Sequence, residues 1–129
     1  MTAQIIRWPG GEHAFRLALA ELETIQQKTD CGPEFLLHRI NAAQWKAADL
    51  FEIIRNGLIG GGMPPVEALK LVRNAFEMHP LIGFKVPAAE VLASCLYGPP
   101  DDPVGEPIPV EPTPEDEKTA AGSSAPTTD

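Results

Sequence analysis

The chain has 129 residues, a formal net charge of -8 and a sequence pI near 4.8. A chain of this length suits one domain rather than two that each bury a separate core. Its acidity argues against nucleic acid as a partner, because phosphate binding depends on basic surfaces that release counterions.

The negative charge is concentrated at one end of the chain. Residues 1–97 contain ten acidic and nine basic residues, whereas residues 98–129 contain eight acidic residues and only Lys118. The second segment also holds eight of the 14 prolines and no aromatic residue, so it has little apolar surface to offset the entropy lost on ordering. We therefore expect a helical domain over 1–97 and a disordered, acidic, proline-rich tail over 98–129.

The cysteines and the hydropathy pattern predict a cytoplasmic protein. Cys31 and Cys95 form no Cys-x-x-Cys pair, and no secretory signal is recognisable near the start of the sequence;. No apolar run approaches the roughly 18 to 20 residues that cross a bilayer. We expect neither a disulfide-dependent fold nor a membrane partner.

The first predicted element is a short β-hairpin. Residues 4–8 mix apolar and polar side chains, Pro9-Gly10-Gly11 supplies turn residues, and residues 12–16 resume the pattern;. A hairpin of two strands is only marginally stable alone. Its apolar side chains should therefore rest on helices, and these are Ile6, Trp8 and Phe15.

Two helices are predicted next. Apolar residues recur at helical spacing over 17–28, and the sequence Asp30-Cys31-Gly32 ends the pattern;. Pro33 suits the first turn of a second helix, because its missing N–H would have no helical partner there. This second helix should end near Asn41.

The third helix is predicted over 46–59. Its inward face carries Leu50, Ile54 and Leu58, and Asp49 falls on the polar side;. The run Gly60-Gly61-Gly62 should end the helix.

The fourth helix should begin at Met63-Pro64-Pro65 and end before Pro80, because proline disfavours helix at the preceding residue, His79. Its apolar stripe begins at Val66. We expect the centre of the core on the third and fourth helices, formed by Leu50, Ile54, Leu58, Leu69, Val72 and Phe76.

A fifth helix is predicted after Pro87, with Cys95 on its apolar side as a small core residue, and it should end before Gly98. Five amphipathic segments can bury their apolar faces only by packing on one another. The predicted fold class is therefore mainly α (α+β), with an N-terminal β-hairpin packed on a bundle of about five short helices.

No residue pattern predicts a catalytic, cofactor or metal site. The Gly60-Gly61-Gly62 run has no following Lys-Ser or Lys-Thr, so we interpret it as a structural turn with at least one glycine at positive φ. His13, His38 and His79 lack the i, i+4 spacing that brings two imidazoles to one metal. Around Cys31, no neighbouring residue marks a base or an oxyanion site.

Four further side chains are open to simple interpretations. Trp8 and Trp45 can either anchor a partner or complete the core. Glu21 and Glu23 are two positions apart and diverge around their helix, so we interpret them as a solvated face.

Three sequence segments suggest a family. After the predicted hairpin come Ala20-Glu21-Leu22-Glu23, then Gly57-Leu58-Ile59-Gly60-Gly61-Gly62, then Glu67-Ala68-Leu69-Lys70-Leu71-Val72, followed by an Ala/Leu-rich last helix. Over about residues 4–97 this order resembles the gene transfer agent tail assembly chaperones, small relatives of phage tail-tube chaperones. The resemblance implies a non-catalytic protein that binds the tape-measure protein and tail-tube subunits, and it is compatible with a homo-oligomer.

Two other functions remain open from the residues alone. A small helical adaptor or regulatory protein would use similar apolar faces to bind a host partner. A small enzyme would need a convergent polar pocket, which the residue pattern does not indicate.

Overall fold

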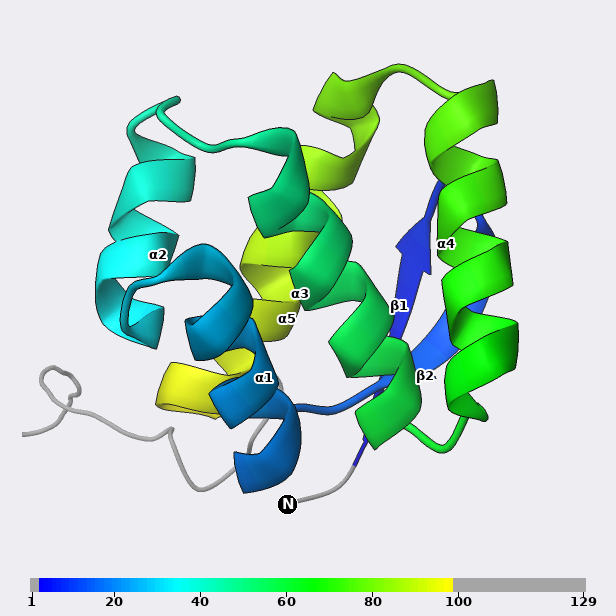
Figure 1. Ribbon diagram of the computed structural model, residues 1–129, viewed down its shortest axis with the longest axis horizontal. Coiled ribbons are helices and arrows are strands. Elements are labelled where there is room, and N and C mark those ends of the chain that lie inside the picture. The colour runs from blue at the N-terminus through cyan, green and yellow to red at the C-terminus, as the bar shows by residue number, and fades with distance from the viewer. Residues whose placement is uncertain (1–2, 99–129) are drawn as a thin grey trace, which may run out of the picture. The chain divides into compact units, whose positions relative to one another are not determined.

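The hairpin and the helices lie close to their predicted positions. In the computed structural model, which describes residues 3–98, strand β1 (Gln4–Trp8) pairs antiparallel with β2 (Gly11–Phe15) around a two-residue loop. The mainly α fold with an N-terminal hairpin is confirmed (Figure 1). The predicted tail lies outside the described residues, apart from Gly98. The helical elements that follow are α1 (Leu19–Thr29), α2 (Pro33–Asn41), α3 (Ala47–Gly60), α4 (Pro65–Met78), the 3-10 helix η1 (Leu81–Phe84) and α5 (Lys85–Tyr97).

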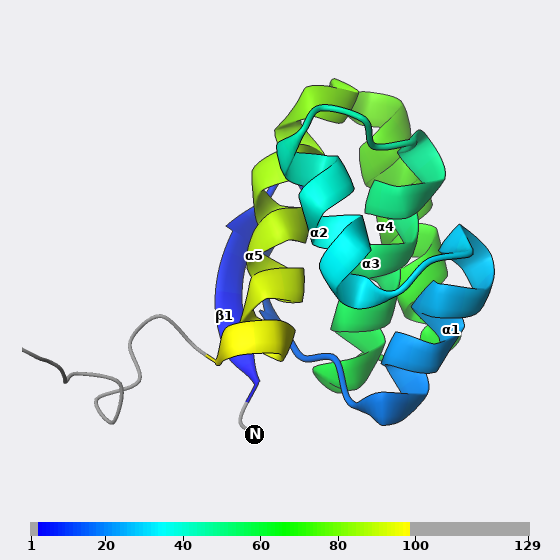
Figure 2. The same cartoon turned by 90° about the vertical axis from the view of Figure 1, so that its left-hand side faces the viewer.

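Helix α3 is the centre of the arrangement. It packs against α1, α4, α5 and strand β2, whereas β1 packs against α5 (Figure 2). The hairpin therefore lies across two neighbouring helices, with one strand over each.

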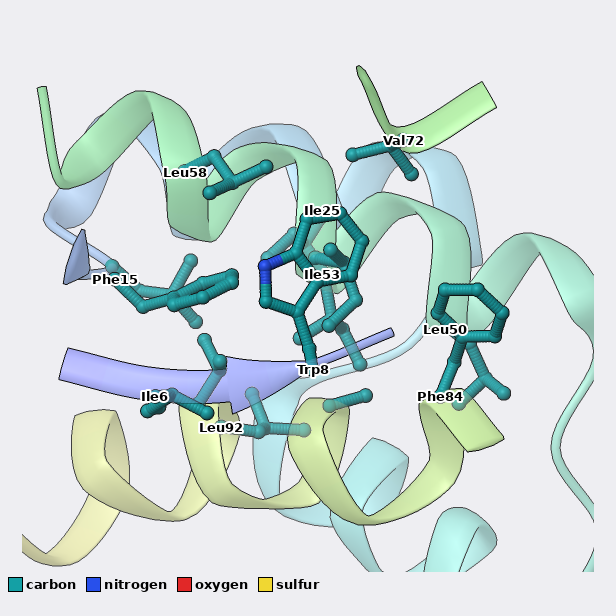
Figure 3. Close-up of a cluster of buried hydrophobic side chains, with 14 of the residues drawn as sticks. Ile6, Trp8, Phe15, Ile25, Leu50, Ile53, Leu58, Val72, Phe84 and Leu92 are labelled. Atoms are coloured by element: carbon teal, nitrogen blue, oxygen red, sulfur yellow. The ribbon is translucent and has the colours of Figure 1, made fainter. Parts of the chain in front are cut away.

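The core joins the hairpin to α3 and α5. Figure 3 shows Ile6 and Phe15 from the hairpin among side chains that include Leu58 and Leu92. Trp8 is also buried, with its indole Nε1 donating to His13 Nδ1 at 2.8 Å. The prediction that the apolar side of the hairpin rests on helices is confirmed.

The predicted centre of the core is only partly correct. Leu50, Ile54, Leu58 and Val72 are buried as expected, but Leu69 and Phe76 are half-buried. Val66, assigned to the inward stripe, is 67% exposed. The cause is that α4 packs closely on α3 alone among the helices, so only a narrow stripe of α4 turns inward. The buried residues of α4 are Ala68, Val72 and Ala75.

A buried aromatic residue of the core, Phe84, comes from η1, an element that was not predicted from the sequence. Phe84 is fully buried and stacks on Phe76, with ring centroids 4.0 Å apart. Helix α5 begins directly after it at Lys85, whereas the helix was predicted to begin only after Pro87. Pro87 therefore lies in the first turn, where a missing N–H costs no helical hydrogen bond.

Asp49 was placed on a polar face, and this prediction is wrong. Its side chain is 1% exposed and accepts hydrogen bonds from Arg39 Nε at 3.1 Å and Nη2 at 2.9 Å. A third bond comes from the backbone N–H of Lys46 at 2.8 Å. The hydrogen bonds that Arg39 donates to Asp49 raise the pKa of Arg39. The pair fastens α2 to the start of α3, and its three bonds satisfy a carboxylate that would otherwise be costly to bury.

The glycines at the end of α3 allow the helix to touch the hairpin. A Cβ at Gly60 would overlap the carbonyl oxygen of Arg16, and one at Gly61 would overlap that of Ala14. Gly62 has a φ of +116°, which confirms that one glycine of the run adopts positive φ. The run thus serves close packing as well as the turn.

Candidate functional site

The histidines and cysteines are scattered over the structure. His13 is half-buried as the acceptor for Trp8, whereas His38 and His79 are exposed. Cys31 and Cys95 are both half-buried and unpaired with each other. Among residues 3–98, no group of three or more His, Cys, Asp or Glu side chains is arranged to hold a metal ion.

Cys95 is half-buried against the core rather than fully inside it, whereas Glu21 is more enclosed than its interpretation as a solvated face suggests. The Sγ of Cys95 lies 3.7 Å from the carbonyl oxygen of Leu17, and burial raises the pKa of this thiol. Glu21 is half-buried and accepts the backbone N–H of Ala18 at 3.0 Å, which caps α1. Both side chains have structural roles, and Glu21 is not simply part of a solvated face.

The surface beside α5 is an open apolar region of the domain. The 13-residue helix carries only two Lys, Arg, Asp or Glu residues, Lys85 and Glu90. A helix that is apolar nearly all round is normally buried on all sides. Here one side is uncovered, and Val86 is 64% exposed.

Two grooves follow the two flanks of this helix. The first, of about 540 Å³, runs between β1 and α5 and is lined by residues 4–9 on one wall and by Gly83, Val86, Pro87 and Glu90 on the other. The second, of about 290 Å³, lies between α2 and α5. Val86 and Glu90 line both grooves and form the ridge between them.

The second groove has a floor of small apolar side chains. Ala89 and Ala93, one helical turn apart, lie there beside Leu37 from α2. Asn41 and Lys85 add polar groups to the lining. Small side chains at this spacing let another backbone come close to the helix.

The first groove continues onto exposed apolar side chains. Ile5 lines the groove and is 66% exposed. Ile82 directly precedes Gly83, which also lines the groove, and is 64% exposed. Apolar side chains gathered beside a groove indicate an interaction surface, whereas single exposed ones such as Val66 need no explanation.

The charges around the grooves are few. Arg7 lies 3.2 Å from Glu12, so its charge is compensated on the hairpin. Glu90 forms no ion pair with any other part of the chain that the structure describes. The surface therefore suits an apolar partner better than a strongly charged one.

The two tryptophans contribute little to this surface. Trp8 is 4% exposed, and its indole belongs to the core. The residue also lines the first groove, but so little of it is exposed that a partner would make little contact with it. Trp45 is half-buried and packs against the core from the loop before α3. The grooves could not be located from sequence, because they depend on which neighbours α5 lacks.

The structure is thus a helical domain with an N-terminal hairpin and a groove on each flank of its last helix. A family model described as phage tail tube protein, GTA-gp10, matches residues 3–98. The chain belongs to this phage tail protein family. The match spans the whole described domain, so the resemblance seen in the sequence is confirmed at the level of the family.

No curated protein and no solved structure matches the chain significantly. Within residues 3–98, no helix has both the length and the apolar character needed to cross a membrane.

Proposed function

We propose that the chain is a non-catalytic tail assembly chaperone, which binds the tape-measure protein and assists assembly of the tail tube. Membership of a phage tail protein family supports a role with tail components. The observation that carries the proposal is α5, a helix with the composition of a buried element whose outer side is open;.

The groove between α2 and α5 suits a helical client. An amphipathic helix docks by laying apolar side chains into such a groove. Ala89 and Ala93 on the floor are small enough to permit the axial separation of roughly 8 to 10 Å that packed helices adopt;. Val86, on the ridge between the grooves, offers further apolar surface. A long helical tape-measure protein presents many such segments, which would aggregate if left uncovered.

The test is co-purification with the tape-measure protein of the same tail. Unmodified protein should retain this client on an affinity column, and Val86→Arg should reduce the retained amount at least about tenfold, because a charge would be desolvated in the groove. The matched control is Val66→Arg. Val66 and Val86 are both the second residue of their helices and are 67% and 64% exposed.

Different results would have distinct meanings. Equal loss of client in both arginine variants would show that added charge, rather than the groove, controls retention. Failure of the unmodified chain to retain the client would contradict the proposed function itself.

A further inference from the structure

Strand β1 has one edge without a backbone partner. It pairs with β2 on one side, and within residues 3–98 no other element forms a backbone hydrogen bond to it. In an antiparallel pair, alternate residues direct their N–H and C=O groups away from the neighbouring strand. All five residues of β1 line the first groove.

This edge lacks the usual features that prevent strand addition. Residues 4–8 contain neither proline nor lysine, and the one charged side chain, Arg7, is held by Glu12 on β2. Exposed edges are commonly protected by such residues or by bulges. The pairing of β1 with β2 is regular from Gln4 to Trp8.

The hairpin is also too narrow for the helices beneath it. Neighbouring strands are about 4.8 Å apart, whereas packed helices are about 8 to 10 Å apart. β2 packs on α3 and β1 packs on α5, but two strands at this spacing leave part of the helix surface uncovered. The first groove lies between β1 and the start of α5, where Val86, Pro87 and Glu90 line it.

We propose that this groove binds an extended segment of another protein, which adds to β1 as a third strand. Its inward side chains would cover Val86 and Pro87, and its outward ones would lie beside Ile5;. The inference does not rest on the chaperone role, because the helical client is assigned to the opposite flank of α5.

A second copy of this chain fits the edge less well than a single strand. Pairing of two β1 edges would place two α5 helices beneath neighbouring strands that are about 4.8 Å apart. Helices need about 8 to 10 Å, and α5 already forms the outer wall of the groove. An extended segment without its own helix at this position avoids the collision.

The charge of the groove further defines the segment. Glu90 lies on the α5 wall and has no ion-pair partner among residues 3–98. The complementary segment therefore alternates apolar side chains with one lysine or arginine on its inward face. Such a rim charge tunes affinity and register more than it supplies binding free energy.

The probe is a seven-residue peptide with the sequence Thr-Val-Thr-Lys-Thr-Val-Thr. In one version the backbone N–H groups of the odd-numbered residues are methylated, and in the other those of the even-numbered residues. Each version therefore keeps one edge that can pair with β1, while its blocked edge prevents the peptide from forming extended sheets with itself. The third version is methylated at every residue. Titration into the full-length chain, followed by amide NMR, should show one half-methylated peptide shifting the Ile5 and Arg7 signals, with no shift from the fully methylated peptide.

Charge reversal tests the location. Glu90→Lys should weaken binding of the lysine peptide by about two- to fivefold, and a glutamate-containing peptide should restore it. Glu67→Lys, an exposed charge reversal on α4, should leave affinity unchanged. Absence of binding by both half-methylated peptides at about 1 mM, equal binding of the fully methylated one, or shifts confined to the α2 side would overturn the proposal.

Discussion

Helices α3 and α5 lie side by side and are both rich in apolar residues, yet they are covered very differently. α3 contacts three helices and a strand, and its inward residues are almost completely buried. α5 is covered by α2, α3 and β1 but keeps an open side, on which Val86 in its first turn is 64% exposed. The difference shows that the apolar composition of a helix does not by itself predict its burial within the chain;. The open side of α5 is the surface at which we propose that a partner binds.

The largest expected effect is in the closed helix. Leu58→Ala in α3 should lower the free energy of unfolding by about 3 to 5 kcal/mol, because the side chain is 1% exposed and its removal leaves a cavity;. Chemical denaturation measures this change. Leu19→Ala is the control, since Leu19 is 71% exposed on α1 and should cost under about 0.5 kcal/mol;. Similar costs for both variants would contradict the assignment of α3 as the core helix.

A second effect concerns the contact between α3 and the hairpin. Gly61→Ala should cost about 3 kcal/mol, because a Cβ there would overlap the carbonyl oxygen of Ala14 and force the backbone apart;. Gly62→Ala meets no neighbour and should cost only about 1 to 2 kcal/mol from its positive φ;. Gly32→Ala, which has open space and ordinary φ, serves as the control. If thermal melts ranked Gly62→Ala above Gly61→Ala, close packing would not be the main role of the run.

A smaller effect should appear on the covered side of α5. Because burial raises the pKa of the Cys95 thiol, the folded protein keeps this proton at a pH where the unfolded chain loses it. The contribution to stability is complete below the ordinary thiol pKa of about 8.5 and is lost as pH rises toward the folded value. Chemical denaturation should give a lower free energy of unfolding at pH 10 than at pH 7. This difference should be smaller in Cys95→Ala. An unchanged difference in that variant would assign the loss to other groups.

The smallest effect is expected from removing the acidic segment. Truncation after Tyr97 should leave the helical circular dichroism signal and the Tm unchanged, because residues 98–129 have few apolar groups with which to dock;. It should lower solubility at high concentration, since like charges repel neighbouring copies over roughly 8 to 10 Å at ordinary salt. A truncated chain that fails to fold would show that the domain extends beyond Tyr97.

The element order was predictable because its signals are local. Pro33 and Pro80 mark a helix start and a helix end, and α2 and α4 have the expected bounds at these positions. The burial of Asp49 was not predictable, because it depends on Arg39, ten positions away on another helix. Likewise, α4 turns inward two alanines that carry little hydropathic signal, whereas Val66 projects outward. Positions set by long-range neighbours cannot be read from periodicity.

The grooves are the clearest case of this limit. Val86 and Val66 occupy the same position in their helices and have nearly the same exposure. Only the placement of β1 and α2 beside α5 distinguishes them, because it turns one valine into the ridge between two grooves. The glycine run gave a partial signal, since its turn was predicted but its contact with Ala14 and Arg16 was not.

The hydrogen bond between the Ser94 hydroxyl and the Gln4 side-chain oxygen joins residues 90 positions apart, and it constrains when the domain can form during synthesis. The hairpin is made first but is only marginally stable without the helices it covers. At roughly 5 to 20 residues per second, α5 follows several seconds later. Both grooves use α5 as a wall, so they come into existence only when the last helix has joined the first strand. An incomplete nascent chain therefore lacks the surface at which we propose that partners bind.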